Sequence, residues 1–427
     1  MASIHQHQPL EIRTAAVRRR DRAFTLVELM VAITGGLFMS VAVFALARDG
    51  SRFYQRESRI GDATMGSVIG FERLRLDIAR AGYLSSPNVR HDPQVCGNPV
   101  TDATWPKQLK KLASIAVEAG PPMPPELATQ VSPDSITLAS SYSSVEAFPV
   151  RNVVDTGAEY QVYLQEKSSA MWRLGYDDTK GQAACQAVLS GVFGAGRALR
   201  IVDKTGSQQY GTISGVSAAT PAQPMVILSR APVLTFRSSG AALCGFRGFE
   251  TGSLANVVNF VRYDIRRLTS ASYGPLYAAS AGDPFDASRT ELVRAELDTD
   301  GKEIAGTQEL VAEYAVDLKL GITVVNSVLN ATDPTLLTLA PGDANIGGWA
   351  GPTDPELAVN RGPHLVRAIR VRLGIRSREA DRKEKISTEP GLFRIGLGPN
   401  GGAPFARVRT LQADIALRNQ TRPTWGL

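Results

Sequence analysis

The chain has 427 residues, of which 43% are hydrophobic and 21% are charged, a composition typical of a folded protein and not of a disordered or multi-spanning one. Its formal charge is +6, but residues 1–23 contribute +3 of it, through five arginines and two carboxylates. The rest of the chain is therefore close to balanced, and the pI of 9.2 is poor support for a nucleic-acid partner.

An apolar run follows the arginines. Residues 24–47 contain one ionisable side chain, that of Glu28. About 20 apolar residues at ~1.5 Å each span a bilayer, so these 24 suffice with some tilt. The run is too long for a secretory signal, so we expect a retained single-pass anchor with a cytoplasmic N-terminus. Within it, Gly35-Gly36 is open to two interpretations, a bend or close helix packing.

Glu28 lies only five residues into this run. A carboxylate well inside a membrane helix costs on the order of a few kcal/mol, so such groups usually have partners. One interpretation is that the side chain reaches back to the interface. The other is that it pairs with a positive charge at the same depth. Residues 24–47 contain no Lys, Arg or His, so this charge would come from another chain or from a newly made N-terminus.

The sequence RAFTLVELMVAI, residues 22–33, resembles the type III signal of type IV pilins and pseudopilins. The resemblance implies that a prepilin peptidase recognises a basic leader containing Arg20 and Arg22, cleaves between Ala23 and Phe24, and methylates the new amine of Phe24. Glu28 would then neutralise the N-terminal amine of a neighbouring subunit. The chain departs from the family in having Ala23 where glycine is usual, and in its long leader.

The helical pattern continues beyond the anchor. No proline interrupts residues 24–86 and Gly82 is a suitable stop, so one helix is predicted over 24–81, roughly 87 Å long. Met65 and Val68 are expected to widen its buried face, and Asp77 is placed among the charged residues outside that face. The buried face itself is predicted from spacings of three and four, at Ile60, Thr64, Ser67, Phe71, Leu74, Ile78 and Ala81.

Strand signals dominate the rest of the chain. Residues 83–133 are rich in Pro, Gly, Asn and Ser and predict an irregular connection with a short helix over 107–118. Residues 308–325 predict a strand, and its first residues could instead form a helical turn. The other predicted strands are short runs of Val, Ile, Leu and Tyr between turn residues, at 134–140, 159–165, 198–203, 224–230, 232–238, 256–268, 365–379 and 406–420.

These elements predict an α+β fold that is pilin-like. A long N-terminal helix, transmembrane over 24–47 and amphipathic over 48–82, packs on a large, mainly antiparallel β domain formed by residues 83–427. The resemblance to prepilins implies that residues 1–23 are a leader that is removed, and the β domain is expected outside the cytoplasm.

Further segments resemble PilW-type minor pilins. FERLRLDIARAGY, residues 71–83, is similar to the end of their long helix, and residues 134–140 occupy the place of their first strand. Residues 294–318 are similar to a segment with the pattern hydrophobic-x-Arg followed by Glu-Leu-Val and Tyr. VRAIRVRLGIRSRE and LQADIALRN resemble their last strands. Residues 140–250 carry no such resemblance.

The sequence lacks the motifs of common catalytic sites, namely HExxH, GxSxG and the Walker A loop. His364 is expected as a surface residue where a strand begins. GLGPNGG, residues 396–402, is predicted to be a loop. DTDGKE, residues 298–303, begins like a calcium loop, but its glycine is at the fourth position and Lys302 is at the fifth, so a hairpin turn is predicted. No catalytic residue, metal or cofactor is expected, and the protein is not expected to be an enzyme.

Arginines alternate with apolar residues over 365–379 and predict a strand with one basic face, which includes Arg370, Arg372 and Arg376. A solvated face or salt bridges between subunits are preferred over an acidic partner or DNA, because aromatic residues are not interleaved.

Three cysteines, Cys96, Cys185 and Cys244, allow one disulfide if the domain is exported, and all three pairings stay open. The remaining cysteine would be buried or free.

By resemblance, the chain is expected to be a PilW-like minor pilin that primes a type IV pilus or lies at its tip. Its partners would be prepilin peptidase, other minor pilins, the major pilin, the inner-membrane assembly platform and membrane lipid. The alternatives are a J-type pseudopilin of type II secretion and, from another class, a membrane-anchored enzyme or sensor. An adhesive or DNA-binding tip is compatible with the first interpretation.

Overall fold

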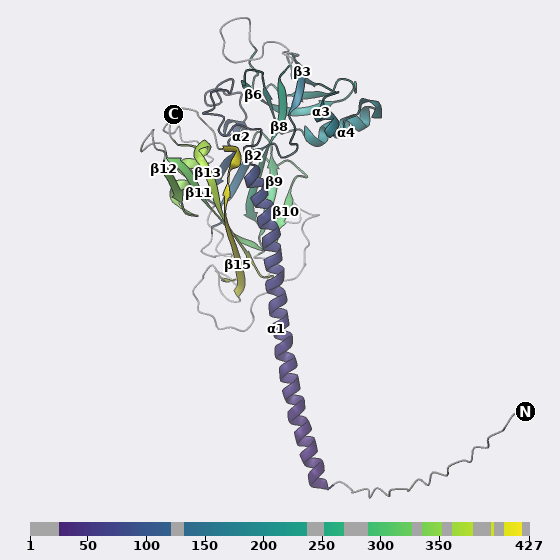
Figure 1. The fold of residues 1–427 in the computed structure, drawn as a ribbon, viewed down its shortest axis with the longest axis vertical. Coiled ribbons are helices and arrows are strands. Elements are labelled where there is room, and N and C mark those ends of the chain that lie inside the picture. Colours follow the sequence, from purple (N-terminus) through teal and green to yellow (C-terminus); the bar gives the residue numbers. More distant parts are fainter. Residues whose placement is uncertain are drawn as a thin grey trace, which may run out of the picture. The chain divides into compact units, whose positions relative to one another are not determined.

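The computed structural model describes residues 25–120, 132–236, 252–268, 289–326, 335–351, 361–378, 394–396 and 405–420. Figure 1 shows their helices and strands. The chain divides into two compact units, residues 1–58 and residues 59–427.

One helix, α1 (Leu26–Arg80), extends over 55 residues and across the boundary between the units. It confirms the single helix expected over residues 24–81. The helix continues without a break through Gly35-Gly36. Gly82, which follows its last turn, has a φ of +79°, a left-handed backbone that favours glycine and ends helices.

Two antiparallel sheets make up most of the second unit, so the predicted α+β class is confirmed. The strands of the ten-stranded sheet are β1 (Ile115–Glu118), β2 (Ser135–Ser140), β3 (Phe148–Asp155), β4 (Tyr160–Leu164), β5 (Ala198–Val202), β6 (Gln208–Ser217), β7 (Met225–Leu228), β8 (Leu254–Arg266), β9 (Glu291–Leu297) and β10 (Glu309–Ala312). The five-stranded sheet has the order β12 (Thr335–Leu339), β11 (Ala315–Asn326), β13 (Val366–Arg376), β15 (Phe405–Ala416) and β14 (Arg394–Gly396). Short helices connect them, α2 (Lys107–Lys110), α3 (Ser169–Arg173), α4 (Gln182–Val192) and α6 (Gly347–Ala350).

The long strand β8 belongs to two parts of the larger sheet. Its first residues, 254–258, pair with β5 on one side, and residues 254–255 pair with β3 on the other. Its later residues pair with β2 and with β9. One strand thus joins two bodies of strands that have separate cores.

The first body is a ring of six strands. The pairings run from β8 through β3, β4, β7, β6 and β5 and back to β8. Its own core includes Phe148, Tyr160 and Leu189, and α3 and α4 contribute to it. Five of the six strands of the ring, β3 to β7, lie between residues 148 and 228, within the stretch 140–250 for which the sequence suggested no family.

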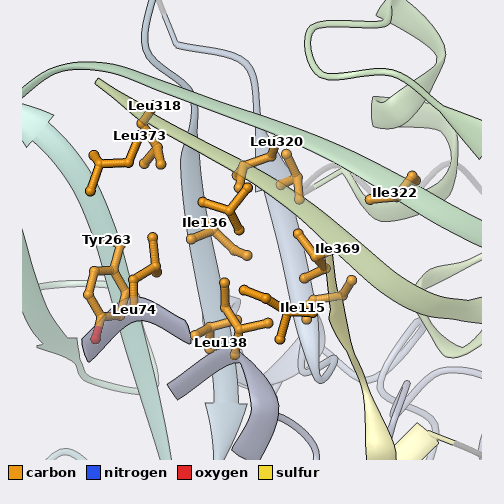
Figure 2. Packing of buried hydrophobic residues seen from close by; sticks show 14 of the residues in the cluster. Leu74, Ile115, Ile136, Leu138, Tyr263, Leu318, Leu320, Ile322, Ile369 and Leu373 are labelled. Carbon is orange, nitrogen blue, oxygen red and sulfur yellow. The ribbon is translucent and has the colours of Figure 1, made fainter. Parts of the chain in front are cut away.

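The second body holds the end of α1. Its core lies among β1, β2 and the later part of β8 from one sheet and β11 and β13 from the other. In Figure 2, Leu74 of α1 lies near Leu138 and Ile136 of β2, with Leu320 and Ile369 of the smaller sheet on the other side of the core.

The face of α1 that enters this core differs in part from the expected one. Met65 and Val68 were expected to widen the buried face, and this is wrong, because both are exposed. The sequence interpretation did not include Gly70 in this face. A Cβ at this position would lie 2.8 Å from Cβ of Ala312 and 3.0 Å from the carbonyl oxygen of Val311. Only glycine therefore lets the helix approach β10 this closely. Thr64, which was predicted on the buried face, is exposed, and the side chain of Ile60 lies outside the described residues. The other five residues of the predicted face are confirmed as buried, Ser67, Phe71, Leu74, Ile78 and Ala81.

Asp77 is buried, whereas the sequence pattern placed it among the exposed charged residues. Its Oδ2 accepts hydrogen bonds from the Tyr263 hydroxyl at 2.7 Å and from Nε of Arg294 at 2.8 Å. Burial alone would lower the pKa of Arg294, but the hydrogen bond that Arg294 donates to Asp77 and the negative charge of that carboxylate raise this pKa above its usual value. Arg294 stays charged, and the pair fastens the last turns of α1 to β8 and β9.

We predict that Asp77→Ala lowers the free energy of unfolding by about 3 kcal/mol or more, because it leaves the Arg294 charge buried without its partner. Chemical denaturation of the full chain in detergent measures this value. Glu72→Ala is the matched control, since Glu72 lies on the same helix in an exposed ion pair with Arg75, and it should cost less than about 1 kcal/mol.

The double variant Asp77→Leu with Arg294→Met removes both charges together and should be more stable than Asp77→Ala. A double variant that is no more stable than Asp77→Ala would show that the uncompensated arginine is not the cause of the loss.

Most predicted strands are confirmed, since β2, β4, β5, β7, β8, β13 and β15 each overlap a predicted segment. Residues 308–325 form β10 and β11, with Tyr314 at a φ of +55° between them, and not a helical turn. The helix expected over 107–118 ends at Lys110, and β1 follows it. The strand expected over 232–238 is wrong for its described part, residues 232–236. The strands and α-helices that were not predicted are β1, β3, β6, β9, β12, β14, α3, α4 and α6.

His364 is buried and not a surface residue as expected. Its ring lies 5.2 Å from that of His91, centroid to centroid, and its Nδ1 lies 3.4 Å from Nδ2 of Asn88. Burial lowers the pKa of His364 to about 4, and the positive charges of His91 and Arg367 add to this effect. The folded protein therefore keeps this imidazole neutral at pH values where an unfolded chain would protonate it.

We predict that the free energy of unfolding falls as the pH decreases from about 6.5 to 4, because the unfolded state then takes up a proton that the folded state excludes. This histidine contributes on the order of 2 to 3 kcal/mol to the change. Denaturation at pH 7 and pH 4.5 should show a smaller loss for His364→Asn than for the natural chain. Equal losses in the two proteins would contradict the assignment.

Candidate functional site

The first turn of α1 holds Glu28 by local hydrogen bonds. Oε2 of Glu28 accepts from the backbone N–H of Thr25 and from its hydroxyl, both at 3.0 Å. The Thr25 Oγ1 in turn accepts from the backbone N–H of Glu28 at 3.2 Å. This reciprocal pattern is a capping box, with Thr25 before the helix and Glu28 three residues on.

The capping box gives Glu28 a role that the sequence interpretation missed, although Thr-x-x-Glu before an apolar run is its sequence signature. It places a carboxylate at the helix N-terminus, where the helix dipole favours negative charge. Both bonds use Oε2. Among the residues described, Oε1 has no hydrogen-bond partner, so the carboxylate has capacity for one more donor.

The predicted cleavage residues Ala23 and Phe24, and the predicted leader residues Arg20 and Arg22, lie outside the described residues. Glu28 is therefore the one member of the predicted N-terminal site that the structure places. It lies in the first turn of α1, four residues after Phe24, where the cut is expected.

The helix beyond this turn is long and apolar enough to cross a membrane over Leu26–Ser51, with a mean hydropathy of 2.3. Its large apolar side chains are exposed, among them Leu37 at 60% and Phe38 at 78%. The hydroxyl of Thr34 donates to the carbonyl oxygens of Met30 and Val31, so it adds no unsatisfied polar group to the segment.

The second half of α1 also presents apolar side chains that no described residue covers. We name the exposed side chains of Met65, Val68, Ile69 and Leu76 the outer stripe. By the helical period these residues lie on the face opposite Leu74, which enters the core. The sequence interpretation missed this second face because it assigned Met65 and Val68 to the buried side.

The basic face expected on β13 is neutralised within the chain. Arg370 forms two hydrogen bonds to the carboxylate of Asp414, at 2.6 and 2.8 Å. Arg372 pairs with buried Asp317 at 2.7 Å. Arg376 is buried and lies 4.8 Å above the ring of Tyr314. Two of the three arginines therefore form salt bridges inside this domain, which the sequence interpretation did not expect, and Arg370 stays partly exposed to solvent.

The turn expected at residues 298–303 is confirmed. Oδ1 of Asp298 accepts from the backbone N–H groups of Asp300 at 2.9 Å and Lys302 at 2.8 Å, and Leu297 bridges to Glu303 across the turn. Within the described ranges, no group of three or more His, Cys, Asp or Glu side chains is placed to hold a metal ion. The loop expected at 396–402 lies almost wholly outside them.

Two of the three cysteines are placed. Cys96 is disulfide-bonded, and Cys185 is buried with a free thiol that donates to the carbonyl oxygen of Asp177. Cys244 lies outside the described residues. One disulfide and one buried free cysteine are the combination that the sequence allowed.

We predict that Cys244 is the partner of Cys96, because the chain has three cysteines and Cys185 is free. Peptide mapping of the unreduced protein should recover one linked pair of peptides, containing residues 96 and 244, and one free thiol at residue 185. A linked peptide that contains Cys185 would contradict the assignment.

Comparison with known proteins gives one match. The family model of the prokaryotic N-terminal methylation motif matches residues 18–34, which include the predicted cleavage site, Thr25 and Glu28. No curated protein and no solved structure matches the chain. The chain thus carries a prepilin-type motif, typical of the substrates of prepilin peptidase, in front of a helix apolar enough to anchor it in a membrane.

Proposed function

We propose that the chain is a PilW-like minor pilin that primes assembly of a type IV pilus or lies at its tip, with a structural and non-enzymatic role. The observation that carries the proposal is the methylation motif at residues 18–34, directly followed by the exposed apolar helix Leu26–Ser51. Prepilin peptidase cleaves between Ala23 and Phe24 and methylates Phe24. The anchor holds the precursor in the cytoplasmic membrane until then.

The geometry of the first turn supports a pairing role for Glu28. Thr25 fixes the carboxylate through Oε2, and Oε1 has capacity for a further donor. After cleavage, the amine of Phe24 in a neighbouring subunit is a donor at the same depth in the apolar bundle. Each charge alone would be costly there, so the pair fixes the axial register of the subunits.

The outer stripe supports lateral packing. Met65, Val68, Ile69 and Leu76 leave a second apolar face open beyond the membrane segment, and neighbouring helices of a pilus bundle would cover it. The head of residues 83–427 is large for a subunit that packs repeatedly along a filament. Few copies at a tip or in a priming complex fit this size better.

The disulfide at Cys96 supports a head outside the cytoplasm, because disulfides persist in oxidising compartments. The arginine-rich leader before the anchor predicts the same orientation. The partners that follow are prepilin peptidase, other minor pilins, the major pilin, the inner-membrane assembly platform and membrane lipid.

We predict that the natural chain, expressed with prepilin peptidase, loses residues 1–23 and starts at a methylated Phe24. Intact mass measurement and N-terminal sequencing check this. A mature protein that keeps Met1 or starts at Ala2 would refute the prepilin interpretation and favour a membrane-anchored enzyme or sensor.

The pairing role is tested with Glu28→Ala and Glu28→Gln, both of which should still be cleaved. The amount that co-purifies with pili should fall about tenfold or more for both, since neither variant carries the charge. Glu57→Ala, a change at an exposed residue of the same helix beyond the membrane segment, is the control and should assemble normally. Normal assembly of Glu28→Ala would contradict the pairing.

Recovery of the natural chain with a type II secretion complex, and not with pili, would favour the J-type pseudopilin.

A further inference from the structure

One aromatic side chain of the six-stranded ring is unusually open. Trp172 on α3 has 79% of its surface exposed, the highest value among the large apolar side chains described in residues 83–420. The other tryptophans described, Trp105 and Trp349, are 5% exposed. The indole therefore leaves a large apolar and aromatic surface accessible for contact with a ligand.

The backbone that carries Trp172 is held firmly. Oγ of Ser168 accepts from the backbone N–H of Met171, which caps α3, and the side chain of Met171 is fully buried. Arg173 forms two hydrogen bonds with Glu146, at 2.7 and 2.6 Å. The hydroxyl of Tyr176 donates to the carbonyl oxygen of Pro221 at 2.6 Å. A ligand would therefore meet a platform that needs little ordering.

Beside this platform is a hollow of about 660 Å³. Its size is in the range of small-molecule sites. Charged groups of both signs line it together with Trp172: Glu166, Lys167, Asp177, Asp178 and Lys180. The 3-10 turn Asp178–Lys180 is capped by Asp177, whose Oδ1 accepts from the backbone N–H and the hydroxyl of Thr179.

This combination selects a class of ligand. Two ammonium groups against three carboxylates leave no cationic excess for a nucleic acid or a sulfated polymer. A cage for a quaternary ammonium needs several open aromatic faces, whereas Tyr176 is buried and its hydroxyl is bonded. Neutral sugars fit: their C–H faces pack on an indole, and their hydroxyls both donate to carboxylates and accept from ammonium groups.

We propose that Trp172 and the adjoining hollow form a binding site for a neutral oligosaccharide. The site lies within residues 166–180, in the ring, and uses none of the residues of the N-terminal motif. It therefore adds a recognition function to the head that is separate from anchoring and assembly.

The test uses the full chain in lauryldimethylamine oxide micelles, because this detergent has no sugar group that would compete. Maltotriose, cellotriose and chitotriose are titrated and followed by calorimetry. We expect at least one of them to bind with a Kd of about 1 mM or below. Trp172→Ala should weaken this binding about tenfold or more, and Trp172→Phe should lose less, because it keeps an aromatic face.

Leu336→Ala is the matched control, since Leu336 is a large apolar side chain of β12 in the other sheet and is 68% exposed. It should bind as the natural chain does. Both alanine variants should keep the natural unfolding midpoint, because each removes an exposed side chain. Three outcomes overturn the proposal: no binding of any trisaccharide at about 10 mM, unchanged binding by Trp172→Ala, or binding of a heparin oligosaccharide or an unstructured peptide in preference to all three.

Discussion

The buried ion pair between Asp77 and Arg294 fixes the position of the end of α1 on the larger β sheet. It joins the last turns of α1 to the strands against which they pack, and the Tyr263 hydroxyl completes it. A buried pair contributes little net stability, but an unpaired member is costly, so the arrangement admits one register of helix on sheet. Asp77 and Arg294 come from two segments that are far apart in the sequence, and the fold brings them into contact.

Local pattern was sufficient for much of the fold. The apolar run and the three-and-four spacing predict α1, and β-branched clusters between turn residues predict most of the long strands. The misses have physical causes. β6 contains glycine, serine and glutamine because it is stabilised by paired strands on both sides, and α4 lacks the charged face that marks a surface helix. Asp77 and His364 were placed outside because their burial depends on partners 217 and 276 residues away.

At the N-terminus, the sequence motif says more about the function of Glu28 than the structure of a single chain does. The expectation that Glu28 pairs with a positive charge follows from the apolar segment around it, and the structure adds that Thr25 already orients the carboxylate. The local capping bonds use Oε2 only, so the proposed pairing between subunits can use Oε1 without breaking them. The outer stripe could have been found from its own helical period. The sequence interpretation missed it because it assumed one apolar face. The helix has two, one that packs against the head and one that the head leaves exposed.

The division of β8 between two bodies has a mechanical consequence. A force that pulls the six-stranded ring along the axis of β8 would act on the hydrogen bonds at both edges of this strand. These bonds are perpendicular to the strand, so they are loaded together in shear. The load would pass from residues 254–258 to residues 259–266, and from Tyr263 through Asp77 into α1. The ring is thus tethered to the helix by one continuous strand, with no flexible linker between them along this path.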